Sequence, residues 1–436
     1  MDKLIALTIE GELSKILGYC IPVVLGIFIF IIPCPFNSAF QEISFYLSAG
    51  ILLLLILRRQ THFSFTSPFT VLFMMFSLWV FICIPFALNK GNSFHDFYAH
   101  LLKHLLVFYL LVNYFKSKRL FIILSWIIVI TITIFSVGGI IYFYFLSGGT
   151  LQGRLGLPEA GVDINHIGFL AIPAIFLTIV LLTTEKNLYK KLFLLVPLVS
   201  TTSVVVLSGT RGAMLGIFIP ILFLFMKNKK IVIIAAAFIL FMIMLTPFKN
   251  EFHLQALKSK VYYDVEIARL PIWYTYAQSI KEHPITGIGY GMQTYDANFF
   301  IKHNSKLPHK YRTIVSVTPG NLFYMPHNTL IDLTVRTGFV GLGLFFFCLY
   351  TFFRMGWLLY KNSVSVCIRK WDLCLMACCL SLLIQGMFVD LMIGFQVIYL
   401  FIFFAMINIL WQIIIYMIYN SEICSFQNSG FLLSHA

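Results

Sequence analysis

Charged side chains are scarce in this sequence, and their scarcity excludes a water-soluble globular protein. Only 11% of the 436 residues are charged, whereas 60% are hydrophobic and the mean hydropathy is +0.90. The apolar runs also lack the alternation of apolar and polar residues that marks the strands of a membrane β-barrel. The composition therefore predicts an all-α polytopic membrane protein, because a spanning helix needs roughly 20 mostly apolar residues.

Several motifs of catalysis and metal binding are also missing. The sequence has no G-x-S-x-G nucleophile motif, no phosphate-binding P-loop and no paired C-x2-C spacing for a metal. No aspartate pair of the D-x-D type occurs in an outer loop, so arginines rather than a metal are expected to hold charge on a substrate. None of the nine cysteines falls in the long polar segment described below, which argues against a disulfide framework there.

Membrane-length apolar runs are abundant instead. Windowed apolarity predicts twelve spans, with a first span in place of a cleavable signal peptide. The expected bounds are 17–34, 43–57, 67–87, 98–115, 120–146, 164–183, 192–209, 213–226, 231–247, 328–360, 372–389 and 395–417. Basic clusters follow spans two, four, six, eight and ten, whereas the short odd-numbered exits carry isolated cations. This positive-inside pattern predicts cytoplasmic termini, and it explains much basic charge without a nucleic-acid partner.

One odd-numbered exit is far longer than the others. Residues 248–326 form a 79-residue polar segment between spans 1–9 in residues 1–247 and spans 10–12 in residues 327–417, and a cytoplasmic tail is expected at 418–436. Loops of this length are usually functional or separately folded. The segment has nine Lys and Arg residues against five Asp and Glu residues. An anionic ligand on the outer face and a basic surface near anionic headgroups explain this surplus equally well.

The polar segment has internal order. Residues 269–284 are expected to form a helix, with Pro271 in its first turn and Pro284 ending it at His283. One face of this helix repeats apolar side chains at helical spacing, namely Ile272, Trp273, Tyr276 and Ile280. A glycine-rich turn, T-G-I-G-Y-G at 286–291, follows. Its glycine spacing does not match a dinucleotide-binding motif.

Three arginines stand near the outer face. Arg211 lies in S-G-T-R-G at 208–212, where one span ends and the chain reverses with almost no loop. Phosphate binding is favoured over snorkelling there, because a guanidinium binds phosphate through two hydrogen bonds. Arg269 stands at the start of the expected loop helix, an anion-binding position, although alone it would be an ordinary surface arginine. Arg154 lies in the loop before span six, where an interfacial loop is at least as good an explanation.

The segment M-P-H-N-T-L-I-D-L at 325–333 opens span ten. His327 is expected in the first turn of that span, and a neutral histidine can act as a general base. Asn328 is expected to cap the helix, and capping explains the pair about as well as catalysis does. Asp332 and Arg336 are four residues apart, so they are expected to pair on one helix face.

Four stretches, taken in order, resemble the O-antigen ligase and polymerase superfamily of bacterial envelope glycosyltransferases. They are the R-L-G loop with a later Asn at 154–165, S-G-T-R-G at 208–212, R-x-x-x-W with H-P-x-x-G-x-G at 269–289, and H-N-x-x-I-D with G-F-V-G at 327–341. The resemblance implies a GT-C-like fold of about twelve transmembrane helices, with helices in one large periplasmic loop. It implies glycan transfer from undecaprenyl diphosphate at the periplasmic face of a bacterial inner membrane, with no cofactor and no metal.

The resemblance also implies roles for residues. By position, Arg211 and Arg269 resemble the arginines that hold the diphosphate, and His327 resembles the essential histidine that activates the acceptor hydroxyl. Supporting roles are expected for Arg154, Asn328, Asp332 and Arg336. In the ligases of this family the acceptor is the lipid A–core oligosaccharide, and membrane lipids surround the protein.

Other functions stay open. A polymerase that joins lipid-linked repeat units shares much of the pattern and is the first alternative. A protein O-oligosaccharyltransferase ranks third, because that group usually has a larger C-terminal region. A lipid or solute transporter is the alternative of a different class, and it is disfavoured because the unusual polar residues cluster at one face and the halves do not match. Asp390, near the outer end of span eleven, is left without a role.

Overall fold

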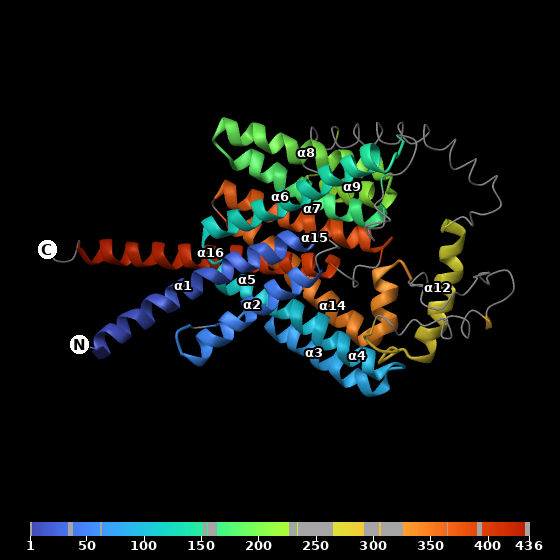
Figure 1. Cartoon of the computed structure of the whole chain (residues 1–436), viewed down its shortest axis with the longest axis horizontal. Coiled ribbons are helices and arrows are strands. Elements are labelled where there is room, and N and C mark those ends of the chain that lie inside the picture. The colour runs from blue at the N-terminus through green and yellow to red at the C-terminus, as the bar shows by residue number, and fades with distance from the viewer. Residues whose placement is uncertain are drawn as a thin grey trace.

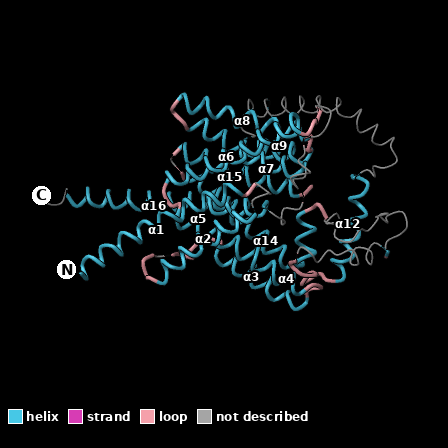
Figure 2. The backbone as a smooth tube through the Cα atoms, in the orientation of Figure 1, coloured by secondary structure: helices cyan, strands magenta, loops and turns pink. Residues whose placement is uncertain are grey.

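The computed structural model is helical throughout the part of the chain that it describes (Figures 1 and 2). The described residues are 2–33, 38–61, 63–150, 155, 164–225, 233, 265–291, 305–306, 326–363, 365–389 and 395–431. No β-strand occurs among these residues, which agrees with the all-α expectation. The expected span 231–247 lies, apart from residue 233, outside the described part, and each of the other expected spans overlaps a described helix.

The described elements follow one another along the chain with short connections. The first group is α1 (Asp2–Ile31), α2 (Ser38–Leu57), α3 (Thr70–Cys83), η2 (Ile84–Phe86), α4 (Lys90–Asp96), η3 (Phe97–Leu102), α5 (Lys103–Tyr114), α6 (Lys118–Ile141) and η4 (Tyr142–Leu146). The second group is α7 (Ile164–Thr184), α8 (Leu188–Ser208), α9 (Arg211–Phe225), α12 (Val265–Glu282), α14 (Thr329–Asn362), α15 (Val366–Gly386) and α16 (Phe395–Phe431).

Length and apolarity make this helical protein fit for a membrane. Five described helical segments are long and apolar enough to cross one, namely Ala39–Leu57, Lys118–Leu146, Leu188–Ser208, Thr329–Asn362 and Gln396–Ile415. Four shorter apolar helices accompany them, namely Ile16–Ile31, Thr70–Phe86, Gly168–Thr184 and Gly212–Phe223. These findings support a multi-pass membrane protein, and the count of twelve spans stays a prediction.

Two helices are longer than the apolar windows predict. α1 begins at Asp2, although the first span is expected from residue 17, and α16 continues to Phe431, although the last span is expected to end at residue 417. Windowed apolarity detects the part of a helix that suits lipid. It does not detect polar turns that extend the same helix into water.

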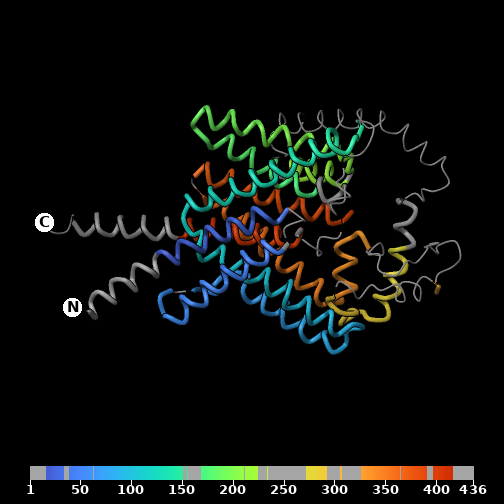
Figure 3. Tube along the Cα trace, in the orientation of Figure 1, coloured from blue at the N-terminus to red at the C-terminus, as the bar shows by residue number. Residues whose placement is uncertain are grey.

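The bundle has two distinct ends. α1 and α16 extend toward one side of the bundle, and α12 lies on the other (Figures 1 and 3). Near the termini, the rings of Phe121 and Trp371 meet at a centroid distance of 5.1 Å, and Lys370 Nζ donates to the carbonyl of Thr183 at 3.2 Å. The starts of α6 and α15 and the end of α7 therefore gather there, beside basic clusters. This agrees with the alternation expected from the charges, and the identity of the cytoplasmic face stays a prediction.

The main core packs aromatic rings from helices that are distant in the sequence. Phe69 at the start of α3 stacks on Phe404 of α16 at a centroid distance of 5.1 Å, and it meets Phe108 of α5 edge-on at 5.8 Å. A second, smaller cluster joins α12 to α14 and consists of Ile272, Tyr276, Ile288 and Val335. The polar segment 248–326 thus packs against α14 through this small separate core.

α14 is one expected span that the structure breaks into two arms. Gly338 has φ 69° and ψ −177°, which ends the helical path, and the chain turns there (Figure 1). We call Thr329–Thr337 the first arm and Phe339–Asn362 the second arm. The second arm alone is long enough for roughly 30 Å of hydrocarbon at about 1.5 Å per residue. The first arm runs across the end of the bundle that faces α12 (Figure 1).

Candidate active site

His327 is held by hydrogen bonds on both sides of it in the chain. The indole Nε1 of Trp273 donates to the carbonyl of Pro326 at 2.8 Å. On the other side, Asn328 Oδ1 accepts from the amides of Leu330 and Ile331 at 3.0 and 3.2 Å, so Asn328 caps α14. The predicted cap is confirmed. His327 itself lies one residue before the cap and not in the first turn, because the cap residue is the last one before the helix.

The backbone of His327 is unusual. Its φ is +47°, in the left-handed region that residues other than glycine rarely adopt. Conformations of this kind persist only where the surroundings enforce them, and they cluster at functional sites. Here the indole of Trp273 and the cap of Asn328 enforce it. The sequence gives no sign of this strain, because it depends on a contact across 53 positions of the chain.

Asn328 also joins the first arm to the end of α15. Its Nδ2 donates to the carbonyl of Met387 at 3.4 Å, and Thr329 Oγ1 donates to the carbonyl of Val389 at 3.2 Å. We call Met387–Val389 the α15 exit. Asp390, which follows it, lies outside the described residues.

The S-G-T-R-G turn packs against the same α15 exit. α8 ends at Ser208, Gly209 has φ +60°, and α9 begins at Arg211, so the predicted reversal with almost no loop is confirmed. A Cβ added to Gly212 would lie 3.1 Å from the ring of Phe388, which shows how closely α9 approaches the α15 exit. The side chain of Arg211 lies outside the described part, but its backbone opens a helix, where peptide dipoles favour anions.

The loop that contains Arg154 reaches the same turn. The amide of Leu155 donates to the carbonyl of Leu207 at 3.0 Å, just before the end of α8. Arg154 itself lies outside the described residues. α7 also comes close, because a Cβ on Gly168 would lie 2.4 Å from Thr210 Oγ1. The turn therefore has room for few side chains on its inner side.

The helix predicted within the polar segment 248–326 is confirmed, and it starts earlier than expected. α12 spans Val265–Glu282, so Pro271 is its seventh residue and not part of its first turn. The residues before Pro271 extend the helix, which tolerates a proline at the loss of one backbone hydrogen bond. The predicted apolar face is also confirmed, because Ile272 and Tyr276 pack with Val335 of the first arm. Arg269 stands one turn before Trp273, and its side chain lies outside the described part.

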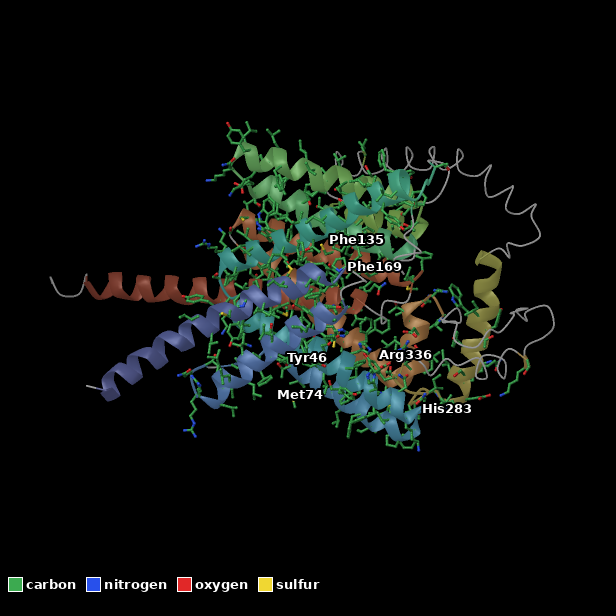
Figure 4. The ribbon with its side chains drawn as sticks, viewed as in Figure 1. Tyr46, Met74, Phe135, Phe169, His283 and Arg336 are labelled. Carbon is green, nitrogen blue, oxygen red and sulfur yellow. The ribbon has the colours of Figure 1, made fainter. Side chains whose placement is uncertain are left out.

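Asp332 and Arg336 pair as the sequence predicts. Arg336 Nε donates to Asp332 Oδ1 at 2.8 Å, and Arg336 NH1 donates to the carbonyl of Tyr290 at 3.0 Å. Arg336 is only 1% exposed and lies beside the glycine-rich turn (Figure 4). The pair therefore fastens the turn to the first arm. These contacts are structural, and the supporting role of the pair in the reaction stays a prediction.

The glycine-rich turn takes over hydrogen bonds that the kink leaves open. In a straight helix the amide of Phe339 would donate to the carbonyl of Val335. Here the Phe339 amide donates to the carbonyl of Pro284 at 2.8 Å, and the Val335 carbonyl accepts from Ile288 at 2.8 Å. The carbonyl of Thr337 accepts from the indole of Trp79 at 2.8 Å. The turn 286–291 and the residues just before it thus satisfy the backbone groups at the kink and stabilise it.

The space at the kink admits only glycine. A Cβ on Gly338 would lie 1.7 Å from the carbonyl oxygen of Ile285, and a Cβ on Gly287 would lie 2.5 Å from the backbone of Val335 and Arg336. Both glycines also have positive φ. The sequence signal for this contact was the unusual glycine density of T-G-I-G-Y-G, which has no other evident purpose. The partners of that run could not be read from it.

Comparison with known proteins supports the family resemblance. Residues 196–346 match a family model described as O-antigen ligase, and this match confirms the resemblance to that superfamily. The matched segment is roughly a third of the chain and contains Arg211, Arg269 and His327. A search of curated proteins finds no match.

Proposed function

We propose that this protein, whose residues 196–346 match a family model described as O-antigen ligase, is an O-antigen ligase of a bacterial inner membrane. It transfers a glycan from undecaprenyl diphosphate to the lipid A–core oligosaccharide at the periplasmic face. One observation carries the proposal. The first turn of α9, which begins at Arg211, and the cap of α14, which follows His327, both contact the α15 exit.

In the proposed reaction His327 is the base. Its imidazole takes the proton of the acceptor hydroxyl while that oxygen attacks the anomeric carbon of the donor sugar. The bond between the anomeric carbon and the diphosphate oxygen breaks, and undecaprenyl diphosphate leaves with the electron pair. A positioned base of this kind typically contributes about 10²–10⁴-fold in rate.

The two arginines stabilise the leaving group. Negative charge on the diphosphate grows as the glycosidic bond breaks, so fixed cations bind the transition state more tightly than the donor. Arg211 and Arg269 supply this positive charge in the proposal, and no metal ion is required. The hydrogen bonds that hold Pro326 and Asn328, on the two sides of His327, support the scheme. A base held rigidly in this way needs no reorganisation during the reaction.

The expected topology suits this chemistry. The donor lipid lies in the membrane and its sugar projects into water, so the site belongs at the boundary. We propose twelve spans with cytoplasmic termini in a GT-C-like arrangement. The gathering of the basic junctions opposite α12 supports this orientation.

The site is tested in a strain that lacks the chromosomal gene and carries plasmid variants. His327→Ala and Arg211→Ala should each reduce glycan attachment to the core by about 10²-fold or more, with normal protein amounts in the membrane. His303→Ala is the matched control, because this histidine of the polar segment lies outside the four stretches that carry the resemblance. Normal glycan attachment in both site variants would contradict the proposed site.

The glycan phenotype of the deletion strain distinguishes the functions. A ligase deletion accumulates lipid-linked polymer and leaves bare core. Core that carries a single repeat would identify the protein as a polymerase and not a ligase. Intact lipopolysaccharide with unglycosylated protein acceptors would favour a protein O-oligosaccharyltransferase, and lipid-linked precursor trapped on the cytoplasmic side would favour a transporter.

A further inference from the structure

A second group of titratable side chains lies outside the site described above. It sits where α4 passes through η3 into α5, and we call His95, Asp96, Tyr98 and His100 the α4 cluster. η3 is a single π-helical stretch between two α-helices. Such stretches are rare, and they are frequent at functional sites because they change which side chains share a face.

The centre of the α4 cluster is a buried carboxylate that orients an exposed imidazole. His95 Nδ1 lies 2.9 Å from Asp96 Oδ1, and the two side chains are 57% and 5% exposed. The neutral imidazole that donates from Nδ1 to this carboxylate presents Nε2 as an acceptor. Within the described part of the chain, the contacts of His95 are with Asp96, Tyr98 and His100. Nε2 is thus left for a ligand.

The neighbouring rings complete a surface with both polar and apolar character. His100 Nε2 lies 3.7 Å from the same carboxylate oxygen. The Tyr98 ring meets the His95 ring edge-on at a centroid distance of 5.3 Å, and Phe94 meets Tyr98 at 5.6 Å. Phe94 and Tyr98 are about half exposed. An aromatic face packs on the C–H face of a sugar ring, while polar groups beside it bind the hydroxyls.

The α4 cluster lies at the same end of the bundle as His327. The amide of Gly291 donates to Ser93 Oγ at 3.3 Å, and the amide of Leu88 donates to the carbonyl of Ile288 at 2.9 Å. The glycine-rich turn thus connects α4 to the Arg336 end of the first arm. His327 stands at the other end, about 13 Å away along the helix axis at 1.5 Å per residue. The cluster is therefore separate from the proposed base.

The chemistry of the cluster excludes two other ligands. A phosphate next to Nε2 would stand close to the Asp96 carboxylate, whose negative charge repels it. A metal would need several ligands, and no group of three or more His, Cys, Asp or Glu side chains in the described residues is arranged to hold one. A neutral molecule with many hydroxyl groups meets neither objection.

We propose that the α4 cluster is a saccharide subsite. Nε2 of His95 accepts a hydrogen bond from a sugar hydroxyl, Asp96 fixes the imidazole, and the Tyr98 ring packs against the sugar. This inference rests on the proposed function, because a glycan-transferring enzyme must hold saccharide at this end of the bundle. The saccharide belongs either to the acceptor core or to the donor glycan.

The test measures binding and not transfer. The purified full-length protein in nanodiscs is titrated separately with lipid-free core oligosaccharide, with lipid-free O-antigen polysaccharide and with inorganic phosphate. His95→Ala and Asp96→Asn should each weaken binding of one saccharide about tenfold, the value of a single hydrogen bond to a ligand. His95→Gln keeps a hydrogen-bonding group and should retain most of the affinity, which separates a lost contact from a misfolded protein. His303→Ala, outside the four stretches that carry the resemblance, is the matched histidine control.

The outcomes are distinct. Weaker binding of the core identifies an acceptor subsite, and weaker binding of the polysaccharide identifies a donor subsite. Unchanged affinity for both saccharides in His95→Ala overturns the proposal, as does wild-type protein that binds neither or a loss of phosphate binding alone. Failure of the proposed function is visible separately, because normal transfer by His327→Ala would reject the base and leave the binding result standing.

Discussion

The two ends of the first arm of α14 differ in their exposure and in how their backbone is held. At its start, His327 is partly exposed, and hydrogen bonds to its neighbours in the chain hold it in a left-handed conformation. At its other end, Arg336 and Gly338 are buried, and the glycine-rich turn satisfies the backbone around them. We call these the open end and the closed end.

The comparison shows where strain is tolerated. At the closed end the left-handed positions are glycines, Gly287 and Gly338, so the backbone adopts them without steric cost. At the open end the left-handed position is a histidine, which carries that cost. Among the described residues other than glycine, Arg59 and His327 have positive φ, and for His327 the proposed function supplies catalysis as the reason.

The largest expected effect belongs to the closed end. Gly338→Ala should destabilise the protein by more than about 4 kcal/mol, because the new Cβ would lie 1.7 Å from a carbonyl oxygen at φ +69°. The yield and melting temperature of membrane-extracted protein, followed by fluorescence-detected size exclusion, measure this. Gly343→Ala is the control, since a Cβ on this second-arm glycine meets nothing within 4 Å. A wild-type yield of Gly338→Ala would show that the kink is not needed.

Breaking the buried ion pair should come next. Arg336→Met leaves the Asp332 charge buried without its partner, which typically costs about 3–5 kcal/mol. The double variant Asp332→Leu with Arg336→Met should recover part of this loss, because no isolated charge remains. Thermal melting of the two variants gives the comparison. If Arg336→Met melts like the wild type and has lost glycan transfer, Arg336 acts on the substrate and the closed end is not purely structural.

Asn328 separates capping from anchoring at the open end. Asn328→Ala removes the cap and should cost about 1 kcal/mol of stability. Asn328→Asp keeps an equally good cap but cannot donate to the carbonyl of Met387. Melting should therefore fall in the first variant only, whereas glycan transfer should fall in both. Wild-type transfer by Asn328→Asp would show that the bond to the α15 exit does not position His327.

The smallest effect reverses an ordinary ranking. Glycine usually destabilises a protein relative to alanine, but the left-handed conformation of His327 favours glycine. The left-handed cost to alanine, about 1–2 kcal/mol, exceeds the entropy cost of glycine, about 0.5–1 kcal/mol, so His327→Gly should be more stable than His327→Ala by about 0.5 kcal/mol, and both should be inactive. Melting temperatures of the two variants test this directly. Higher stability of His327→Ala would mean that position 327 carries no strain.

Local patterns predicted much of the site. The cap at Asn328, the pair of Asp332 and Arg336, and the apolar face of the loop helix all follow from spacings of two to four residues within one helix. The reversal at S-G-T-R-G follows from its small residues. Each of these features is confirmed, since each depends on neighbours in the chain.

Contacts between distant segments could not be predicted in the same way. The indole of Trp79 binds a carbonyl 258 positions away, and the α15 exit was no part of the expected site. In the sequence, Gly338 is an ordinary glycine in a transmembrane run, because glycines are frequent there. The special role of Gly338 depends on the carbonyl of Ile285, which the fold brings so close that no Cβ fits at the kink.

The corner at Gly338 also fixes depth. A straight α14 would carry His327 roughly 16 Å beyond that glycine at 1.5 Å per residue. In the proposed topology the second arm spans the hydrocarbon, and this distance exceeds the polar layer of one leaflet, which is about 5–8 Å thick. With the first arm turned aside, the cap beside His327 stays level with the ends of α9 and α15. If the protein has the proposed function, this bend is what holds the imidazole of His327 at the height of the lipid phosphates.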